Sequence, residues 1–186
     1  ATTAQSSCDD ADAGYYVDQT TQTTQTECSI GTYQATTGQS SCDDADAGYY
    51  VPTTAQSNQT ECGLGTYQAT TGQSSCDDAD AGYYVPIIAQ SNQTECGLGT
   101  YQALTSQSSC DDADAGYYVD QTTQTTQTEC AIGTYQATTG QSSCDDADAG
   151  YYVPIIAQSN QTECGLGTYQ ALTSQSSCDD ADAGYY

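Results

Sequence analysis

The chain has 186 residues, a formal net charge of −25 and no lysine, arginine, histidine, methionine, tryptophan or phenylalanine. Because no cationic side chain is present to hold phosphate, the composition excludes nucleic acid and anionic membranes as electrostatic partners. No apolar run in the sequence approaches the roughly 18–20 residues of a membrane span, and the polar start lacks the basic region of a signal peptide, so we expect no membrane insertion in this segment.

The composition is typical of disorder, but cysteine and tyrosine argue against it. Leu, Ile and Val together number only 16, too few for an ordinary aliphatic core. The chain nevertheless holds 11 cysteines and 17 tyrosines. We therefore expect an ordered, disulfide-rich fold in which tyrosine replaces much of the missing aliphatic core.

The cysteines define a strict tandem repeat. A long step from Cys8 to Cys28 is followed by a short step from Cys28 to Cys42, and the same two steps alternate without exception along the chain, which gives a 34-residue period. Both ends of the chain fall in mid-repeat, so we expect a window cut from a longer array. Repeat length never varies, which suggests that neighbouring repeats dock on one another. The expected divisions, five full repeats between two partial ones, are 1–8, 9–42, 43–76, 77–110, 111–144, 145–178 and 179–186.

The first element in each repeat is an acidic turn, DDADAG, which contains Asp9, Asp10, Asp12 and Gly14 in the first copy. Oxygen ligands at alternate positions around a turn are found in calcium loops, but the bidentate glutamate and the remaining ligands of such a loop are missing. We interpret the turn as a solvated acidic surface and keep Asp10 and Asp12 as calcium candidates. No other cofactor is expected.

Glycine-tyrosine segments follow the acidic turn as GYY and recur later in the repeat as GTY. Thr, Gly and Tyr favour short strands and turns, and the few aliphatic residues lack the spacing of an amphipathic helix. Adjacent residues in a strand, such as Tyr49 and Tyr50, point to opposite faces. We expect one of each pair to pack inward beside a disulfide. The other would face solvent, where it could stack on sugars or on a neighbouring fibre.

A variable polar segment lies between the tyrosine pair and the next cysteine. It contains the only three asparagines of the chain, Asn58, Asn92 and Asn160, each in an Asn-Gln-Thr acceptor for N-glycosylation. The same position, four residues before a cysteine, holds Thr24 or Thr126 in the other two copies. We expect N-glycans at the asparagines, and Thr24 and Thr126 are candidate O-glycosylation sites.

The last segment of each repeat reads C-x2-G-x-Y-x4-G-x3-C, as in Cys28, Gly31, Tyr33, Gly38 and Cys42. This segment resembles the ephrin-receptor-like cysteine-rich repeat, a relative of the TNF-receptor module. It recurs five times, with serine in place of the second glycine in two copies, but the C-x2-C that usually links the family's units is missing. The resemblance implies an extracellular, elongated and non-enzymatic ectodomain.

Cysteine spacing alone allows two disulfide patterns, one closing the short steps and one closing the long steps. The resemblance favours the shorter loops, which also enclose a glycine-containing turn. Cys8 is then left over, with its partner expected upstream of the chain. The absence of histidine and of C-x2-C argues against zinc. The pairs that the resemblance implies are Cys28–Cys42, Cys62–Cys76, Cys96–Cys110, Cys130–Cys144 and Cys164–Cys178.

An ordinary enzyme site is not expected in this chain. Without His, Lys or Arg there is no general base near neutrality, no cation to pair with an oxyanion and no imidazole to activate Ser or Cys. The predicted fold class is small, disulfide-rich and mainly β or irregular: an elongated tandem-repeat rod of short hairpin-like modules with little or no helix.

The predicted function is that of a structural protein in an extracellular, glycosylated filament or appendage. Its expected partners are copies of itself, along or beside a fibre, and covalent glycans. The alternative is a spacer or stalk of a receptor or adhesin at the cell surface. Both predictions place the chain outside the cell.

Overall fold

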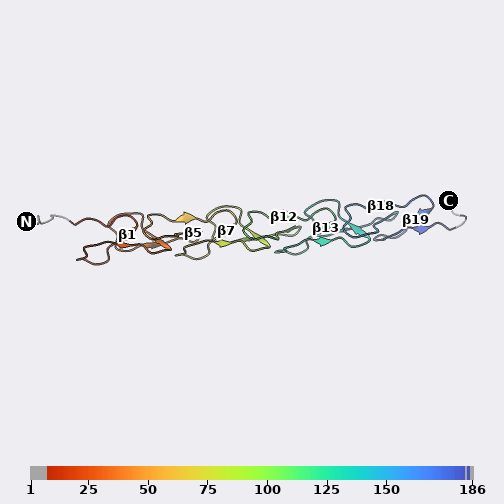
Figure 1. The fold of residues 1–186 in the computed structure, drawn as a ribbon. Helices are drawn as coiled ribbons and strands as arrows, with labels where there is room; N and C mark the ends of the chain where they lie inside the picture. Colours follow the sequence, from red (N-terminus) through yellow and green to blue (C-terminus); the bar gives the residue numbers. More distant parts are fainter. Residues whose placement is uncertain (1–7, 183, 185–186) are drawn as a thin grey trace, which may run out of the picture. The chain divides into compact units, whose positions relative to one another are not determined.

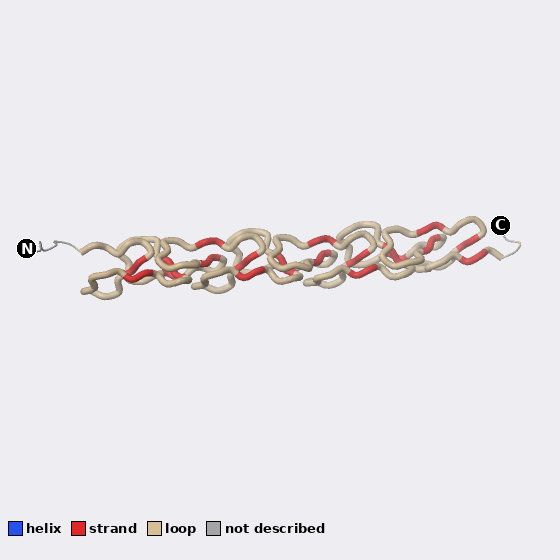
Figure 2. The backbone as a smooth tube through the Cα atoms, in the orientation of Figure 1, coloured by secondary structure: helices blue, strands red, loops and turns tan. Residues whose placement is uncertain are grey.

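The computed structural model describes residues 8–182 and 184 of the chain. Within these residues, two-residue strands pair into ten antiparallel hairpins, and no helix occurs. Figure 2 shows that most of the backbone is loop and turn rather than strand. The fold therefore depends on turns and on hydrogen bonds between hairpins more than on extended sheets.

Two kinds of hairpin alternate along the chain (Figure 1). The Tyr-Tyr hairpins pair a Tyr-Tyr strand with a Thr-Glu strand: β1 (Tyr15–Tyr16) with β2 (Thr26–Glu27), β5 (Tyr49–Tyr50) with β6 (Thr60–Glu61), β9 (Tyr83–Tyr84) with β10 (Thr94–Glu95), β13 (Tyr117–Tyr118) with β14 (Thr128–Glu129), and β17 (Tyr151–Tyr152) with β18 (Thr162–Glu163). The Thr-Tyr hairpins pair a Thr-Tyr strand with an Asp-Asp strand: β3 (Thr32–Tyr33) with β4 (Asp43–Asp44), β7 (Thr66–Tyr67) with β8 (Asp77–Asp78), β11 (Thr100–Tyr101) with β12 (Asp111–Asp112), β15 (Thr134–Tyr135) with β16 (Asp145–Asp146), and β19 (Thr168–Tyr169) with β20 (Asp179–Asp180).

The hairpins belong to two compact units. Of the described residues, the first unit holds 8–79 and 85–93, with the hairpins from β1 to β8. The second unit holds 80–84, 94–182 and 184, with the hairpins from β9 to β20. The same kinds of local contact recur inside each unit.

The two kinds of hairpin are equivalent at a spacing of 17 residues, half of the repeat. Each begins with a tight turn. In the first Tyr-Tyr hairpin Tyr15 N donates to Asp12 O at 3.0 Å, and in the Thr-Tyr hairpin that follows Thr32 N donates to Ser29 O at 3.0 Å. The third residue of each turn is a glycine with positive φ, such as Gly31 at 85°, and this glycine recurs every 17 residues. The sequence analysis did not predict this half-repeat.

Close packing is a second reason for glycine at the turn. A Cβ added to Gly116 would lie on the carbonyl oxygen of Ala157 and 2.8 Å from its carbonyl carbon. Ala157 belongs to the loop between β17 and β18, two hairpins further along. Since φ at Gly116 is also positive, at 89°, both backbone conformation and contact exclude a side chain there.

Within a unit, backbone hydrogen bonds join each hairpin to the next two. Gly116 N donates to Gln136 O in the following hairpin at 2.8 Å. Ala157 N, two hairpins on, donates back to Cys130 O at 2.9 Å. Both kinds of bond recur at the half-repeat spacing within each unit, so the hairpins of a unit are docked in chain order. Such docking was expected from the invariant repeat length.

The core of each unit consists of two columns of small or polar side chains. One column alternates alanine with cysteine; its buried members are Ala11, Cys28, Ala45, Cys62, Ala79, Cys96, Ala113, Cys130 and Ala147. The other alternates glutamine with valine; its buried members are Gln34, Val51, Gln68, Val85, Gln102, Val119, Gln136, Val153 and Gln170. Each hairpin thus contributes one residue to each column.

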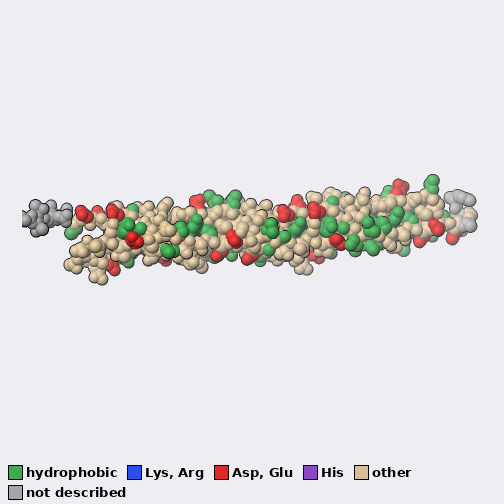
Figure 3. All heavy atoms as spheres, in the orientation of Figure 1, with side chains coloured by type: hydrophobic (Ala, Val, Ile, Leu, Met, Phe, Trp, Pro, Cys, Tyr) green, Lys and Arg blue, Asp and Glu red, His purple; other side chains and the backbone are tan. Residues whose placement is uncertain are grey.

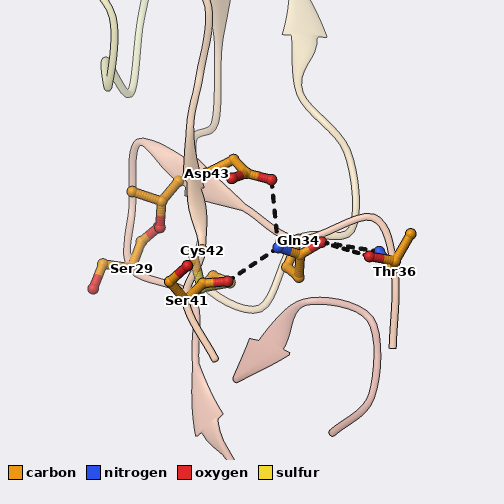
Figure 4. The surroundings of a disulfide bond; sticks show 8 residues. Ser29, Gln34, Thr36, Ser41, Cys42 and Asp43 are labelled. Carbon is orange, nitrogen blue, oxygen red and sulfur yellow. Dashed lines mark hydrogen bonds between the residues drawn. A yellow bond between two sulfur atoms is a disulfide. The ribbon is translucent and has the colours of Figure 1, made fainter. Parts of the chain in front are cut away.

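Hydrogen bonds satisfy the buried glutamines. Figure 4 shows Gln34 between two segments of its own hairpin: its Nε2 donates to Ser41 O at 3.0 Å, and its Oε1 accepts from the Thr36 backbone N at 3.0 Å. Among the described residues, no buried side-chain nitrogen or oxygen lacks a hydrogen-bond partner. Because an unsatisfied buried amide costs about 1–3 kcal/mol, these bonds are what allows a polar residue in the core.

Five disulfides join cysteines 14 residues apart, with Cα–Cα distances of 5.7 or 5.8 Å. The pairs are those that the resemblance implies, from Cys28–Cys42 to Cys164–Cys178. Each disulfide closes a Thr-Tyr hairpin, and a loop of this length contributes about 3 kcal/mol through the entropy of the unfolded chain.

A hydrogen-bonded pair takes the place of the disulfide in the Tyr-Tyr hairpins. Gln161, 17 residues before Cys178, donates from Nε2 to Asp148 Oδ2 at 2.7 Å, and Asp148 N donates to Gln161 Oε1 at 2.7 Å. Ala147, 17 residues before Cys164, is fully buried beside this pair. Both kinds of hairpin are therefore closed at equivalent positions. A disulfide closes the Thr-Tyr hairpins, and a Gln–Asp pair closes the Tyr-Tyr hairpins.

Most hairpin loops contain one residue with positive φ, and in several loops this residue is not glycine. Thr123 has φ of 61°, which is strained for a β-branched residue. Its amide donates to Cys96 O, two hairpins back, at 3.0 Å. Thr21 occupies the same place in an identical segment, but its φ is not positive and no described hairpin precedes it. The positive φ of Thr123 thus occurs together with a hydrogen bond to the hairpin two places back.

The predicted fold class is confirmed for the described residues: a mainly β, disulfide-rich tandem repeat of hairpin halves without helix. Repeat limits placed at the cysteines, such as 9–42, divide a Thr-Tyr hairpin. Limits such as 12–45 keep both hairpins of a repeat, and the turns that begin them, whole.

Candidate functional site

The Asn-Gln-Thr acceptors lie in the surface loops of the Tyr-Tyr hairpins. The loop at 51–59 joins β5 to β6, and its equivalents occupy the same place in the other Tyr-Tyr hairpins. The side chains at the predicted carbohydrate positions are all exposed: Asn58, Asn92, Asn160, Thr24 and Thr126. A sugar at any of them would extend into solvent without displacing a packed residue.

The middle residue of the acceptor is fixed to the acidic turn. Asp46 N donates to Gln59 Oε1 at 2.6 Å, and Gln59 Nε2 donates to Asp46 Oδ2 at 2.7 Å. The next residue, Thr60, begins β6 and pairs with Tyr50. The acceptor is thus anchored on its C-terminal side, while Asn58 is exposed.

Carboxylates of the acidic turns accept hydrogen bonds within the fold. On the face shown in Figure 3, acidic side chains are scattered rather than gathered in one patch. Asp12 Oδ2 accepts from Gln25 Nε2 at 2.8 Å, whereas the Asp10 carboxyl group lies 3.4 Å from where a Cβ of Gly38 would be. The two calcium candidates therefore contact different neighbours. In the described part of the chain, no group of three or more His, Cys, Asp or Glu side chains could hold a metal ion.

The tyrosine pairs do not divide into one inward and one outward residue. Tyr49 and Tyr50 are both half-buried, and the same is true of the other described pairs. The expected division is therefore not seen, since neither tyrosine of a pair is fully buried and neither is fully exposed.

The single tyrosine of the Thr-Tyr hairpin lies close to acidic side chains. Tyr135 is paired with Asp145 across the hairpin. Burial raises the pKa of the Tyr135 phenol above its ordinary value near 10.0, and the charges of Asp148 and Asp145 raise this pKa further. The pKa values of the equivalent Tyr33 and Tyr101 are raised for the same reasons.

One shallow depression, open to solvent, has a volume of about 350 Å³. It is lined by Tyr152, Gly165, Thr168, Ser177 and Cys178. Cys178 is held in a disulfide, and the lining contains no carboxylate or imidazole to activate the serine hydroxyl. The depression has no arrangement suited to nucleophilic catalysis.

Two further observations concern the surroundings of the chain. Cys8 is exposed and has no disulfide partner among the described residues. No helix in the described ranges is long and apolar enough to cross a membrane.

Sequence reasoning missed the Gln–Asp pairs that hold the loops, such as Gln59 with Asp46. Their signal is the half-repeat spacing: Gln59 stands 17 residues before Cys76, and Gly48 stands 17 residues after Gly31. Aligning the two halves of a repeat would have placed Gln59 where the partner half has a disulfide.

Comparison with known proteins gave no match, either to a family model or to a curated protein. The resemblance to the ephrin-receptor-like repeat is therefore an interpretation of the C-x2-G-x-Y spacing.

Proposed function

We propose that this chain is a structural protein of an extracellular, glycosylated filament or appendage. The observation that carries the proposal is the set of backbone hydrogen bonds that docks each hairpin on the next two within a unit. Adding one more repeat to such a unit extends it without changing any local contact, as in other solenoid arrays. A fold of this kind suits a spacing or load-bearing role.

The disulfides favour an extracellular or secreted protein, since such bonds persist in oxidising compartments. They also compensate for the thin core, in which the largest fully buried side chain is valine. The net charge of −25 keeps neighbouring copies soluble through mutual repulsion.

Carbohydrate is the second part of the proposal. N-glycans on Asn58, Asn92 and Asn160 would stand at equivalent exposed loop positions, and Thr24 and Thr126 would carry O-glycans at the same place. Catalysis is not part of the proposed role, because the chain lacks cationic and imidazole side chains.

A stalk that carries a binding domain away from a cell surface is the second candidate. The C-x2-G-x-Y spacing around Cys28, Gly31 and Tyr33 favours it, because the family that it resembles is found in ectodomains. Docked hairpins would serve both roles.

Immunogold electron microscopy separates the two candidates. Antibodies raised against the folded chain should label filaments at many points along their length. Labelling confined to a layer next to the cell membrane, with none on filaments, would refute the filament and support the stalk.

A further inference from the structure

Three exposed aliphatic side chains lie in two loops of the second unit. Ile155 and Ile156 are 59% and 49% exposed, in the loop between β17 and β18. Leu172 is 64% exposed, in the loop between β19 and β20. We refer to Ile155, Ile156 and Leu172 as the apolar trio. Contiguous exposed apolar surface can mark a place where another group packs.

The two loops of the trio are neighbours in the fold. The loop that carries Leu172 is held at both ends by the start of the preceding hairpin: Gly150 N donates to Gln170 O at 2.8 Å, and Val153 N donates to Gln175 O at 2.9 Å. Ile155 follows Val153 by two residues. The loop that carries Leu172 is therefore the immediate backbone neighbour of the segment that leads into Ile155 and Ile156.

The trio changes as a set between repeats. The equivalent residues are all aliphatic or all polar, and mixed sets do not occur. The sets are Gln19, Thr20 and Thr36; Thr53, Thr54 and Thr70; Ile87, Ile88 and Leu104; Gln121, Thr122 and Thr138; and Ile155, Ile156 and Leu172.

Both aliphatic sets belong to repeats that contain an N-glycosylation acceptor, and both repeats without an acceptor have a polar set. In the second unit Asn160 follows Ile156 by four residues in the same loop and is exposed. Four residues span at most about 14 Å, which is shorter than a branched oligosaccharide of several sugars.

We propose that the N-glycan on Asn160 covers the apolar trio. The C–H faces and N-acetyl methyl groups of its first sugars pack against Ile155, Ile156 and Leu172 and remove apolar surface from water. The glycan is the favoured occupant because it is covalently attached within the same loop. A second copy of the chain would have to displace it. This proposal rests on the glycosylation proposed above.

The chain contains its own matched control. Asn58 lies at the equivalent position beside a polar set, Thr53, Thr54 and Thr70. The full chain, produced through a eukaryotic secretory pathway, is compared with Asn160→Gln and Asn58→Gln variants. Intact mass before and after deglycosylation reports occupancy, disulfide mapping reports folding, and the fluorescence of the uncharged dye Nile red reports exposed apolar surface.

Asn160→Gln should increase Nile red fluorescence, whereas Asn58→Gln should leave it unchanged. Adding Ile155→Thr, Ile156→Thr and Leu172→Thr to the Asn160→Gln variant should abolish the increase. If both asparagines carry glycans and the two single variants behave alike, the covering role is wrong while the glycosylation stands. A mass that shows bare Asn160 in the parent chain overturns both. Self-association of the fully glycosylated chain that is lost with the three threonine substitutions would assign the trio to a second copy instead.

Discussion

A disulfide can be built into a Tyr-Tyr hairpin if the two kinds of hairpin are equivalent. The variant is Ala147→Cys with Gln161→Cys, which places cysteines 17 residues before Cys164 and Cys178. Ala147 is buried in the same column as Cys130, and its amide donates to Gly133 O at 2.9 Å, as that of Cys130 donates to Gly116 O. The new pair should therefore have the geometry of the natural disulfides, whose Cα atoms are 5.7 or 5.8 Å apart.

The expected gain follows from two opposing terms. A loop of this length removes about 3 kcal/mol of chain entropy from the unfolded state. The substitution of Gln161 loses two hydrogen bonds with Asp148, each worth about 1 kcal/mol in a partly exposed place. The free energy of unfolding should therefore rise by about 1 kcal/mol over that of the parent chain.

The assay compares urea denaturation of the oxidised variant, the parent chain and a control that carries Gln161→Ser alone and keeps the buried Ala147. The serine control loses the same hydrogen bonds without gaining a cross-link, so the oxidised variant should exceed it by about 3 kcal/mol. Non-reducing peptide maps need an Asp-specific protease, because the chain offers trypsin no lysine or arginine.

Two results would refute the half-repeat equivalence. One is a map in which the new cysteines stay reduced or exchange with Cys130, Cys144, Cys164 or Cys178. The other is an oxidised variant that forms the intended bond but is no more stable than the serine control.

The remaining predictions concern loop strain, turn packing and alkaline pH. Thr123→Gly should raise the free energy of unfolding by about 1 kcal/mol, because glycine relieves the strain of positive φ. Thr21→Gly should not raise it. Equal effects of the two substitutions in urea denaturation would contradict the idea that docking imposes the strained conformation. Gly116→Ala should lower the free energy of unfolding by more than about 1 kcal/mol, because a side chain there clashes with its neighbour and the backbone is strained. Gly165 is at an open position without positive φ. Gly165→Ala should therefore be nearly neutral by the same measurement. Because the pKa of Tyr135 is raised in the folded state, its contribution to stability is complete below the unfolded pKa and is lost as pH rises from there through the folded pKa. Tyr135→Phe should make the alkaline loss smaller in melts above pH about 10, and an unchanged loss would show that this phenol does not contribute.

The cysteine spacing and the glycine-tyrosine segments were enough to predict the repeat and the hairpin halves. The alternating long and short cysteine steps fix the period, and the lack of an aliphatic helical pattern excludes helices. The disulfide pairs, such as Cys28–Cys42, needed the family resemblance in addition, because spacing alone left two patterns open.

The core could not be predicted from hydrophobicity. Gln34 reads as a surface residue, and it is buried only because Ser41 and Thr36 satisfy its amide. The half-repeat was hidden for a similar reason. Alanine and cysteine alternate in one column and glutamine and valine in the other, so equivalent positions carry chemically unlike residues. Only the constant spacing of glycines, as from Gly14 to Gly31, indicates in the sequence that the two halves of a repeat are equivalent.

The docking of successive hairpins is the central claim, and amide hydrogen exchange on the oxidised full chain measures it directly. The amides of Gly116 and Ala157 donate across hairpins, and among the described residues no disulfide joins the two hairpins that the Ala157 bond links. If the hairpins are docked, these amides should exchange as slowly as that of Cys130, which donates within its own hairpin to Gly116 O. Rapid exchange at Gly116 and Ala157 with slow exchange at Cys130 would mean independent, flexibly linked hairpins, and would contradict the account.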